Sequence, residues 1–162
     1  MTTRSLSLRR HVDASPEQVY DAVSDLRRMA GWSEEYFGSW RFFRTAPRVG
    51  ARFVGWNRNG WHVWFTICTV VEATRPSSFV FESGLLGMPI ARWSYQIAPD
   101  RGGCSVEESW RDLRADDRSG AVARWLGAVF AGTPTEVRVR RNQAGIEQTL
   151  ARLAEELSAQ VS

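Results

Sequence analysis

The spacing of the hydrophobic residues divides the chain into a helical start, a strand-rich middle and a helical end. Within SPEQVYDAVSDL, apolar residues recur every three or four positions from Val19 to Leu26, which predicts one amphipathic helix. Ser15 caps this helix, Pro16 suits its first position and Gln18 completes a capping box. The predicted elements of this block are a strand over 5–14, the helix itself, and a short helix or turn over 27–35.

The middle of the chain is rich in β-branched and aromatic side chains, which favours strands. Groups of turn residues separate the runs, and each group contains a glycine or a proline. Connections this short predict consecutive strands that pair antiparallel. The predicted strands cover 38–45, 51–57, 60–73, 77–83, 89–98 and 104–113.

The last block is helical again. Thr133, Pro134 and Glu136 repeat the arrangement of cap, proline and capping box, and the helix that follows is roughly 25 residues long. A single curved sheet needs a cover on its concave face, and this helix is the one predicted element long enough to provide it. The sequence thus predicts an α+β fold in which a curved antiparallel sheet of about seven strands wraps around a long C-terminal helix. The apolar stripe of this helix consists of Ile146, Leu150, Leu153 and Leu157.

Composition fits one folded domain over residues 1–162, with 43% hydrophobic and 24% charged residues. The formal net charge is +3, and the 21 cationic side chains are all arginines, scattered among 18 acids. Scattered cations form no basic face, so the charge pattern disfavours a nucleic-acid partner. The densest run, Arg138 to Arg141, lies in the last predicted helix, where a solvated face is expected.

Other classes of chemistry have no support in the sequence. Cys68 and Cys104 lack the spacing of a zinc site or a disulfide framework and are expected to stay reduced. Phosphate-binding glycine loops and the zinc-protease and serine-hydrolase motifs are missing, so no metal and no cofactor are expected. No segment has the apolar length of a membrane span or the form of a signal peptide, which predicts no membrane insertion and a cytoplasmic location.

The order of these elements is that of a known superfamily. The segments ASPEQVYDAVSDL, RVGARFVGWNRNGW, TVVEATRP and WSYQIAPDRGGCSVEESW resemble the START-like (SRPBCC) helix-grip superfamily, above all its polyketide cyclase/dehydrase-like branch, over roughly residues 4–158. The resemblance implies a deep cavity between the sheet and the long helix that holds a hydrophobic or aromatic small molecule. It also implies a role in antibiotic biosynthesis and a monomer or homodimer. One fold hosts unrelated functions, so the activity depends on the site.

The stretch WNRNGWHVWF, from Trp56 to Phe65, raises the question of which rings reach such a cavity. A two-residue loop at Arg58 and Asn59 would pair Trp56 with Trp61. Either face could then be core, but we favour a cavity on the side that mixes rings with hydrogen-bonding groups. That side carries Phe53, Gly55, Asn57, His62, Trp64, Thr66 and Cys68, and the other carries Trp56, Trp61, Val63, Phe65 and Ile67.

Later strands supply a candidate acid. Alternation places Trp93 and Tyr95 on one face of their strand and Glu108 beside Trp110 on the next, all pointing inward. A buried carboxyl without a counter-ion has a raised pKa, in the range useful for proton transfer. The alternative is that Glu108 pairs with an arginine or lies at the sheet margin.

The remaining candidates each have two interpretations. His62 is a general base or a surface histidine, and Tyr36 donates a hydrogen bond to a ligand carbonyl or closes the mouth of the cavity. Apolar residues in predicted loops suit either a cavity entrance or an oligomer contact: Leu85, Leu86, Met88, Trp125 and Phe130.

Two functions follow from the fold, the resemblance and these residues. The first is a cofactor-independent cyclase or dehydrase that folds a reactive polyketide or similar aromatic precursor, and the second is a non-catalytic carrier or sensor of a lipid-like metabolite. The predicted catalytic residues are Glu108, His62 and Tyr36, and the predicted ligand-binding residues are Trp32, Phe53, Asn57, Trp64, Thr66, Trp93, Tyr95, Trp110 and Trp125.

Overall fold

A computed structural model describes residues 5–41, 47–114 and 135–161. Within these ranges, seven antiparallel strands form one sheet in the order β1-β7-β6-β5-β4-β3-β2. Consecutive strands from β2 to β7 are neighbours, as the short connections predict. The strands are β1 (Ser5–Val12), β2 (Tyr36–Arg41), β3 (Arg52–Asn59), β4 (His62–Thr74), β5 (Ser78–Leu85), β6 (Met88–Asp100) and β7 (Gly103–Asp112).

Three helices occur in the described ranges, α1 (Pro16–Val23), α2 (Leu26–Trp32) and the long α4 (Thr135–Val161). The capping box of α1 is confirmed, because the backbone N–H of Gln18 donates to Ser15 Oγ at 3.2 Å and the backbone N–H of Ser15 donates to Gln18 Oε1 at 2.9 Å. The two short helices and the long C-terminal helix match the predicted order. The predicted cap of α4 at Thr133 and Pro134 lies outside the described residues.

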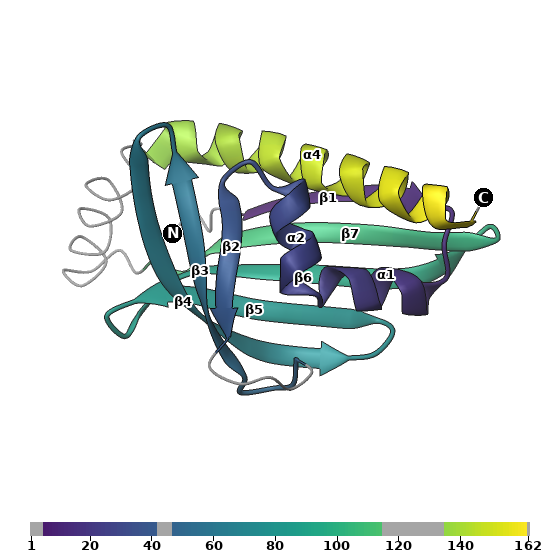
Figure 1. The fold of residues 1–162 in the computed structure, drawn as a ribbon, viewed down its shortest axis with the longest axis horizontal. Coiled ribbons are helices and arrows are strands. Elements are labelled where there is room, and N and C mark those ends of the chain that lie inside the picture. The colour runs from purple at the N-terminus through teal and green to yellow at the C-terminus, as the bar shows by residue number, and fades with distance from the viewer. Residues whose placement is uncertain (1–4, 42–46, 115–134, 162) are drawn as a thin grey trace.

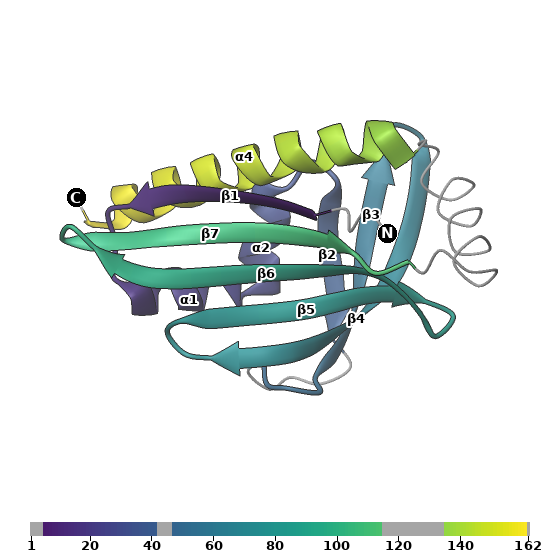
Figure 2. The same cartoon turned by 180° about the vertical axis from the view of Figure 1, so that it is seen from behind.

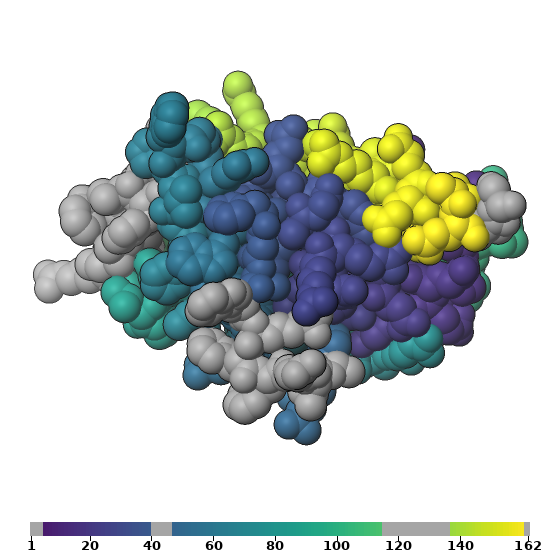
Figure 3. Space-filling view, viewed as in Figure 1, coloured from purple at the N-terminus to yellow at the C-terminus, as the bar shows by residue number. Residues whose placement is uncertain are grey.

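The long helix α4 packs along β1 and β7 (Figure 1). Helix α2 contacts both α4 and β2, the strand at the opposite edge of the sheet from β1. Figure 2 shows from behind how the strands curl beneath the helix. In the space-filling view, α1 and α2 lie beside α4 and cover much of this face (Figure 3). The sheet therefore wraps around one helix, and the space between them is closed on one side by the two short helices.

Bulges help to curl the sheet. The pairing of β4 with β5 shifts between Val70 and Glu72, and that of β5 with β6 shifts between Ser83 and Gly84. An extra residue in one strand increases the local twist and bends that strand. β4 and β6, at 13 residues each, are long enough to follow such a bend across the whole sheet.

The predicted apolar stripe of α4 forms the contact with the sheet. Ile146, Leu150, Leu153 and Leu157 are between 0% and 2% exposed. Each such side chain stabilises the fold by about 1.5–3 kcal/mol when it is removed from water. They pack with the buried valines of α1 and β7 into one core, which fixes the helix over the strands.

The turn of the β3–β4 hairpin differs from the prediction. The residues between the two strands are Gly60 and Trp61, so Trp56 pairs with Phe65 and not with Trp61. Gly60 suits the turn because its φ of 57° is a conformation that glycine adopts without strain. The partner of Trp56 lies four positions further along β4 than predicted. Because four is an even number, every residue keeps its predicted face. Trp61 is fully exposed and Cys68 is buried.

Candidate ligand cavity

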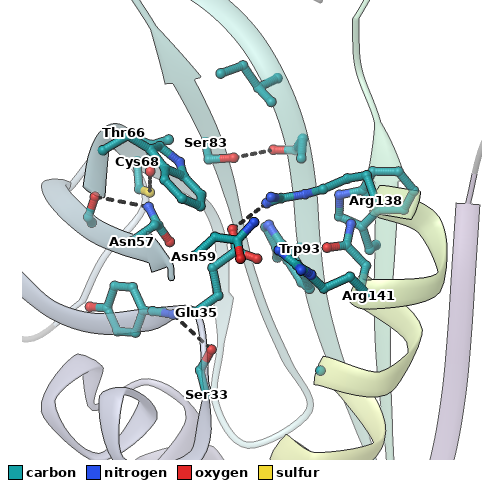
Figure 4. Close-up of a pocket in the computed structure, with 18 of the residues that line it drawn as sticks. Ser33, Glu35, Asn57, Asn59, Thr66, Cys68, Ser83, Trp93, Arg138 and Arg141 are labelled. Carbon is teal, nitrogen blue, oxygen red and sulfur yellow. Dashed lines mark hydrogen bonds and ion pairs between the residues drawn. The ribbon is translucent and has the colours of Figure 1, made fainter. Parts of the chain in front are cut away.

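A cavity of about 450 Å³ lies between α4 and the concave face of the sheet. Its volume is within the range of roughly 300–1,000 Å³ that is typical of small-molecule sites. We call the buried part of the lining, around Phe53, Tyr95 and Glu108, the floor. We call the more exposed part, around residues 58–60 and Arg141, the mouth. Figure 4 shows polar side chains from the strands and from α4 that converge on this space.

Most of the predicted site residues meet in this cavity. Strand alternation explains the result, because every second residue of a strand points to the concave face. The cavity also explains two apolar residues of the predicted 84–88 loop, because Leu85 ends β5, Met88 begins β6 and both line the cavity. Leu86 is exposed in the turn between them. The predicted residues that line the cavity are Tyr36, Phe53, Asn57, Trp64, Thr66, Trp93, Tyr95, Glu108 and Trp110.

His62 does not belong to the cavity. It is the first residue of β4, opposite Asn59, and its side chain is exposed. Alternation assigned it correctly to the concave side of the strand, but at the tip of the hairpin that side opens to solvent. The structure therefore does not bring His62 into the cavity, as the alternative of a surface histidine expects.

Trp32 was also predicted to bind the ligand, and the structure places it elsewhere. It is 3% exposed and is absent from the cavity lining. Its indole N–H donates to Glu156 Oε2 at 2.5 Å, and Arg28 forms an ion pair with the same carboxylate at 2.6 Å. Trp32 thus holds α2 against α4, a role that the local sequence could not reveal because its partner lies 124 positions away. Trp125 and Phe130 lie outside the described residues.

Glu108 is the most unusual group of the floor. It is 3% exposed, and the hydroxyl of Tyr95 donates to its Oε1 at 3.0 Å. Its Oε2 has no hydrogen-bond partner among the described residues. Burial raises the pKa of Glu108 to about 8, and the hydrogen bond from Tyr95 lowers it only in part. No arginine in the described ranges pairs with Glu108, and with this pKa the neutral carboxyl predominates at pH 7.

Aromatic rings surround this acid. Phe53 and Phe81 meet edge to face with ring centroids 5.6 Å apart. Trp110 lies two residues after Glu108 on the same face of β7 and is 4% exposed. An apolar floor of this kind excludes water and keeps the carboxyl uncharged, because no solvent stabilises the ionised form.

Tyr36 closes the cavity beside β3. Its hydroxyl donates to the backbone carbonyl of Leu26 at 3.4 Å, which ties β2 to α2. The ring approaches Gly55 so closely that a Cβ at that position would lie 3.3 Å from it. A glycine there makes room for the tyrosine, which therefore forms part of the wall.

An ion pair spans the mouth. Arg138 Nη2 of α4 donates to Glu35 Oε1 at 2.5 Å, and its guanidinium lies 5.6 Å from the centre of the Trp64 ring. Arg138 Nη1 is buried and has no partner among the described residues. Figure 4 shows Arg138 and Arg141 reaching from the helix toward the strands.

These α4 residues were missed because a run of arginines is usually a solvated face. A signal was nevertheless present. Arg138, Asn142, Gly145 and Thr149 recur at steps of four, three and four, which is the spacing of one helical face. All four line the cavity beside the apolar stripe, as does Arg141. A polar stripe that is parallel to a buried one is therefore the pattern that points to a lined cavity.

The cysteine thiols are unreactive, and the potential metal ligands of the described residues are not clustered. Burial raises the pKa of the Cys68 thiol to about 12, so it stays protonated. Cys68 and Cys104 are both free. Among the described residues, no group of three or more histidines, cysteines and acids could hold a metal ion. None of the helices in the described ranges combines the length and apolarity needed to span a membrane.

A curved sheet that wraps around a long helix, with an internal cavity between them, defines a helix-grip protein. Three solved structures share this fold. The Polyketide_cyc-like protein Cgl2372 of Corynebacterium glutamicum has a TM-score of 0.65 and 24% identity, with 99% of this chain and 95% of that chain covered. Protein CV1439 of Chromobacterium violaceum has a TM-score of 0.64 and 18% identity, with 94% of this chain and 96% of that chain covered. Ara h 8.0201 has a TM-score of 0.67 and 7% identity, with 98% of this chain and 99% of that chain covered.

The family follows from the sequence itself. Residues 3–158 match the family described as polyketide cyclase / dehydrase and lipid transport. The chain therefore belongs to this family. No curated protein matches the sequence.

Proposed function

We propose that the protein binds a polyketide-like aromatic or similarly apolar molecule in the cavity and assists its cyclisation or dehydration, with Glu108 as the proton-transferring group. The observation that carries this proposal is the buried carboxyl of Glu108 on the cavity floor, whose pKa burial raises to about 8 and whose Oε2 has no partner among the described residues. A group with a pKa near the working pH can both give and take a proton. Two polar side chains meeting at this point, Glu108 and Tyr95, favour chemistry over simple storage.

For a dehydration, Glu108 alone can complete the catalytic cycle. The neutral Glu108 gives its proton to a hydroxyl of the substrate, whose C–O bond breaks and releases water. The resulting carboxylate removes a proton from the neighbouring carbon, and the C–H electron pair becomes the new double bond. One water leaves and Glu108 is protonated again. The aromatic walls contribute by holding the substrate in a reactive conformation and excluding water.

Binding in the cavity is tested with N-phenyl-1-naphthylamine, an uncharged dye that fluoresces in apolar sites. Thr66→Phe places a ring in the cavity, whereas Thr69→Phe makes the same change on the outer face of the same strand. We expect Thr66→Phe to weaken dye binding about tenfold and Thr69→Phe to leave it unchanged, because only the first removes cavity volume. Equal affinities for the two variants would contradict a ligand site in this cavity.

Catalysis is tested by native mass spectrometry of the wild type and Glu108→Gln, each purified from the native host. If Glu108 drives dehydration, the variant retains a molecule heavier by one water than the product of the wild type. Recovery of one identical molecule from both proteins would contradict catalysis and leave the carrier as the function.

A non-catalytic carrier of a lipid-like metabolite is the second candidate. The position of His62 favours it, because this histidine is exposed and leaves Glu108 without a nearby basic partner in the described floor. In a carrier, the neutral carboxyl would only donate a hydrogen bond to a ligand oxygen. In both functions the partner is a small molecule, since α4 covers the concave face that a nucleic acid would need.

A further inference from the structure

We propose that the ligand is an organic acid, whose carboxylate binds Arg138 and Arg141 at the mouth while its apolar body lies over the floor. This inference rests on the proposed function, because it requires a small molecule in the cavity. It adds the chemical class of that molecule and assigns a recognition site to α4.

The argument begins with donors that lack acceptors. Arg138 Nη1 and Asn142 Nδ2 are buried, and neither has a hydrogen-bond partner among the described residues. Asn142 is 5% exposed, so solvent does not satisfy its amide. A buried donor without an acceptor costs about 1–3 kcal/mol. Both groups line the cavity, and both belong to one face of α4. An acceptor supplied by the ligand would remove this cost.

Arg141 adds a second cation to the same place. It follows Arg138 by one helical turn, lines the cavity, and forms no ion pair with another described residue. In Figure 4 its guanidinium group points toward the strands from the same side of α4 as that of Arg138. The two guanidinium groups and the Nδ2 of Asn142 present N–H donors, whereas an ionised carboxylate presents only acceptors.

The surrounding charges favour an anion at this position. Arg114, a further cation of the lining, is already paired with Asp112 at 2.5 Å. Glu35 compensates part of the charge of Arg138, and Glu34 is an exposed acid that also lines the cavity. Glu108 is neutral at pH 7 and contributes no negative charge to the floor. On the α4 side of the mouth, Arg141 is therefore a cation without an ion-pair partner among the described residues.

Glu35 itself shows that a carboxylate fits Arg138. Its side chain approaches from the loop before β2 and uses one edge of the guanidinium, while the ring of Trp64 supports the face. The other edge carries Nη1, which is buried and has no partner among the described residues, on a side chain that lines the cavity. A second carboxylate at this edge would give Nη1 its missing acceptor. Arginine suits this role because its fork can serve two acceptors at once.

The test uses two competitors with the same carbon skeleton, 1-naphthylacetic acid and 2-(1-naphthyl)ethanol, which displace N-phenyl-1-naphthylamine at pH 7. The acid is ionised and the alcohol is neutral. We expect the acid to displace the dye from the wild type at about one tenth of the alcohol concentration, as a charge-assisted hydrogen bond allows. Arg138→Gln and Arg141→Gln should each remove most of this preference and leave the alcohol unaffected.

Arg140→Gln is the matched control, since Arg140 lies on the same helix, is exposed and does not line the cavity. It should retain the full preference for the acid. Arg141 is exposed, so its substitution tests the proposal even if Arg138→Gln is poorly folded. Equal potency of acid and alcohol on the wild type, or a preference that survives both substitutions, would overturn the organic-acid site. Failure of the dye to bind in the cavity would instead overturn the proposed function.

Discussion

Glu108 and Glu35 line the same cavity, yet their surroundings differ. Glu35 at the mouth forms an ion pair with Arg138, and its side chain is 21% exposed. Glu108 on the floor has no cation partner among the described residues, and burial raises its pKa to about 8. The chemistry of a glutamate here is therefore set by its surroundings, and a single ligand can meet a cationic group at one end and a proton donor at the other.

The largest effect is expected from Glu108→Gln. Because the folded-state pKa is about 8 and therefore above the unfolded value, the contribution of Glu108 to stability is fully present below about pH 4.5 and is lost as the pH rises to about 8. The slope is about 1.4 kcal/mol per pH unit, several kcal/mol in all. Glu108→Gln should abolish this slope and be more stable than the wild type at pH 8.5, as measured by urea unfolding at pH 5, 7 and 8.5.

Glu107→Gln provides the control for this measurement. Glu107 lies on the opposite face of β7 and forms an ion pair with Arg9 at 2.7 Å, which lowers the pKa of Glu107. The contribution of Glu107 to stability is present above its unfolded pKa and is lost in acid. The Glu107→Gln variant should therefore keep the slope of stability between pH 5 and pH 8. An unchanged slope in Glu108→Gln would show that the floor does not keep this acid neutral.

A smaller effect is expected from Tyr95→Phe. The hydroxyl of Tyr95 is the donor to Glu108, and its loss removes about 1 kcal/mol at pH 5. The same hydrogen bond holds the pKa of Glu108 down, so the variant should extend the loss of stability to a higher pH. The urea series measures both changes. Tyr20→Phe is the control, since Tyr20 packs on Phe79 away from the cavity and should not move the upper pH limit.

The smallest change in stability is expected from Glu35→Gln. A partly exposed ion pair contributes about 1 kcal/mol or less, so unfolding should change little. Loss of the competing carboxylate frees Arg138, and 1-naphthylacetic acid should displace the dye severalfold more effectively. Glu155→Gln removes an exposed acid of α4 that does not line the cavity, so this control should change neither quantity. A weaker preference for the acid in Glu35→Gln would mean that Glu35 orients Arg138 and does not compete with the ligand.

The candidate site was predictable where it depends on strand alternation. Trp64, Trp93 and Glu108 reach the cavity because a strand sends every second side chain to one face. The turn of the β3–β4 hairpin was predicted at the wrong residues, but the face of each residue was predicted correctly, because the pairing differs by an even number of residues. His62 and Trp32 lie outside the cavity lining because depth along a strand and a distant partner decide their environments, and neither can be read from local sequence.

The sequence by itself determined the order of elements, the capping box of α1, the apolar stripe of α4 and the sidedness of the strands, because each depends on residues close together in the chain. Only the tertiary structure decided which polar groups lack partners. The ion pair of Arg138 with Glu35 joins residues 103 positions apart. The lack of a described cation beside Glu108 likewise depends on which elements pack around the floor. The free energy of a charge is set by everything packed around it, and that surrounding exists only once the sheet has closed around the helix.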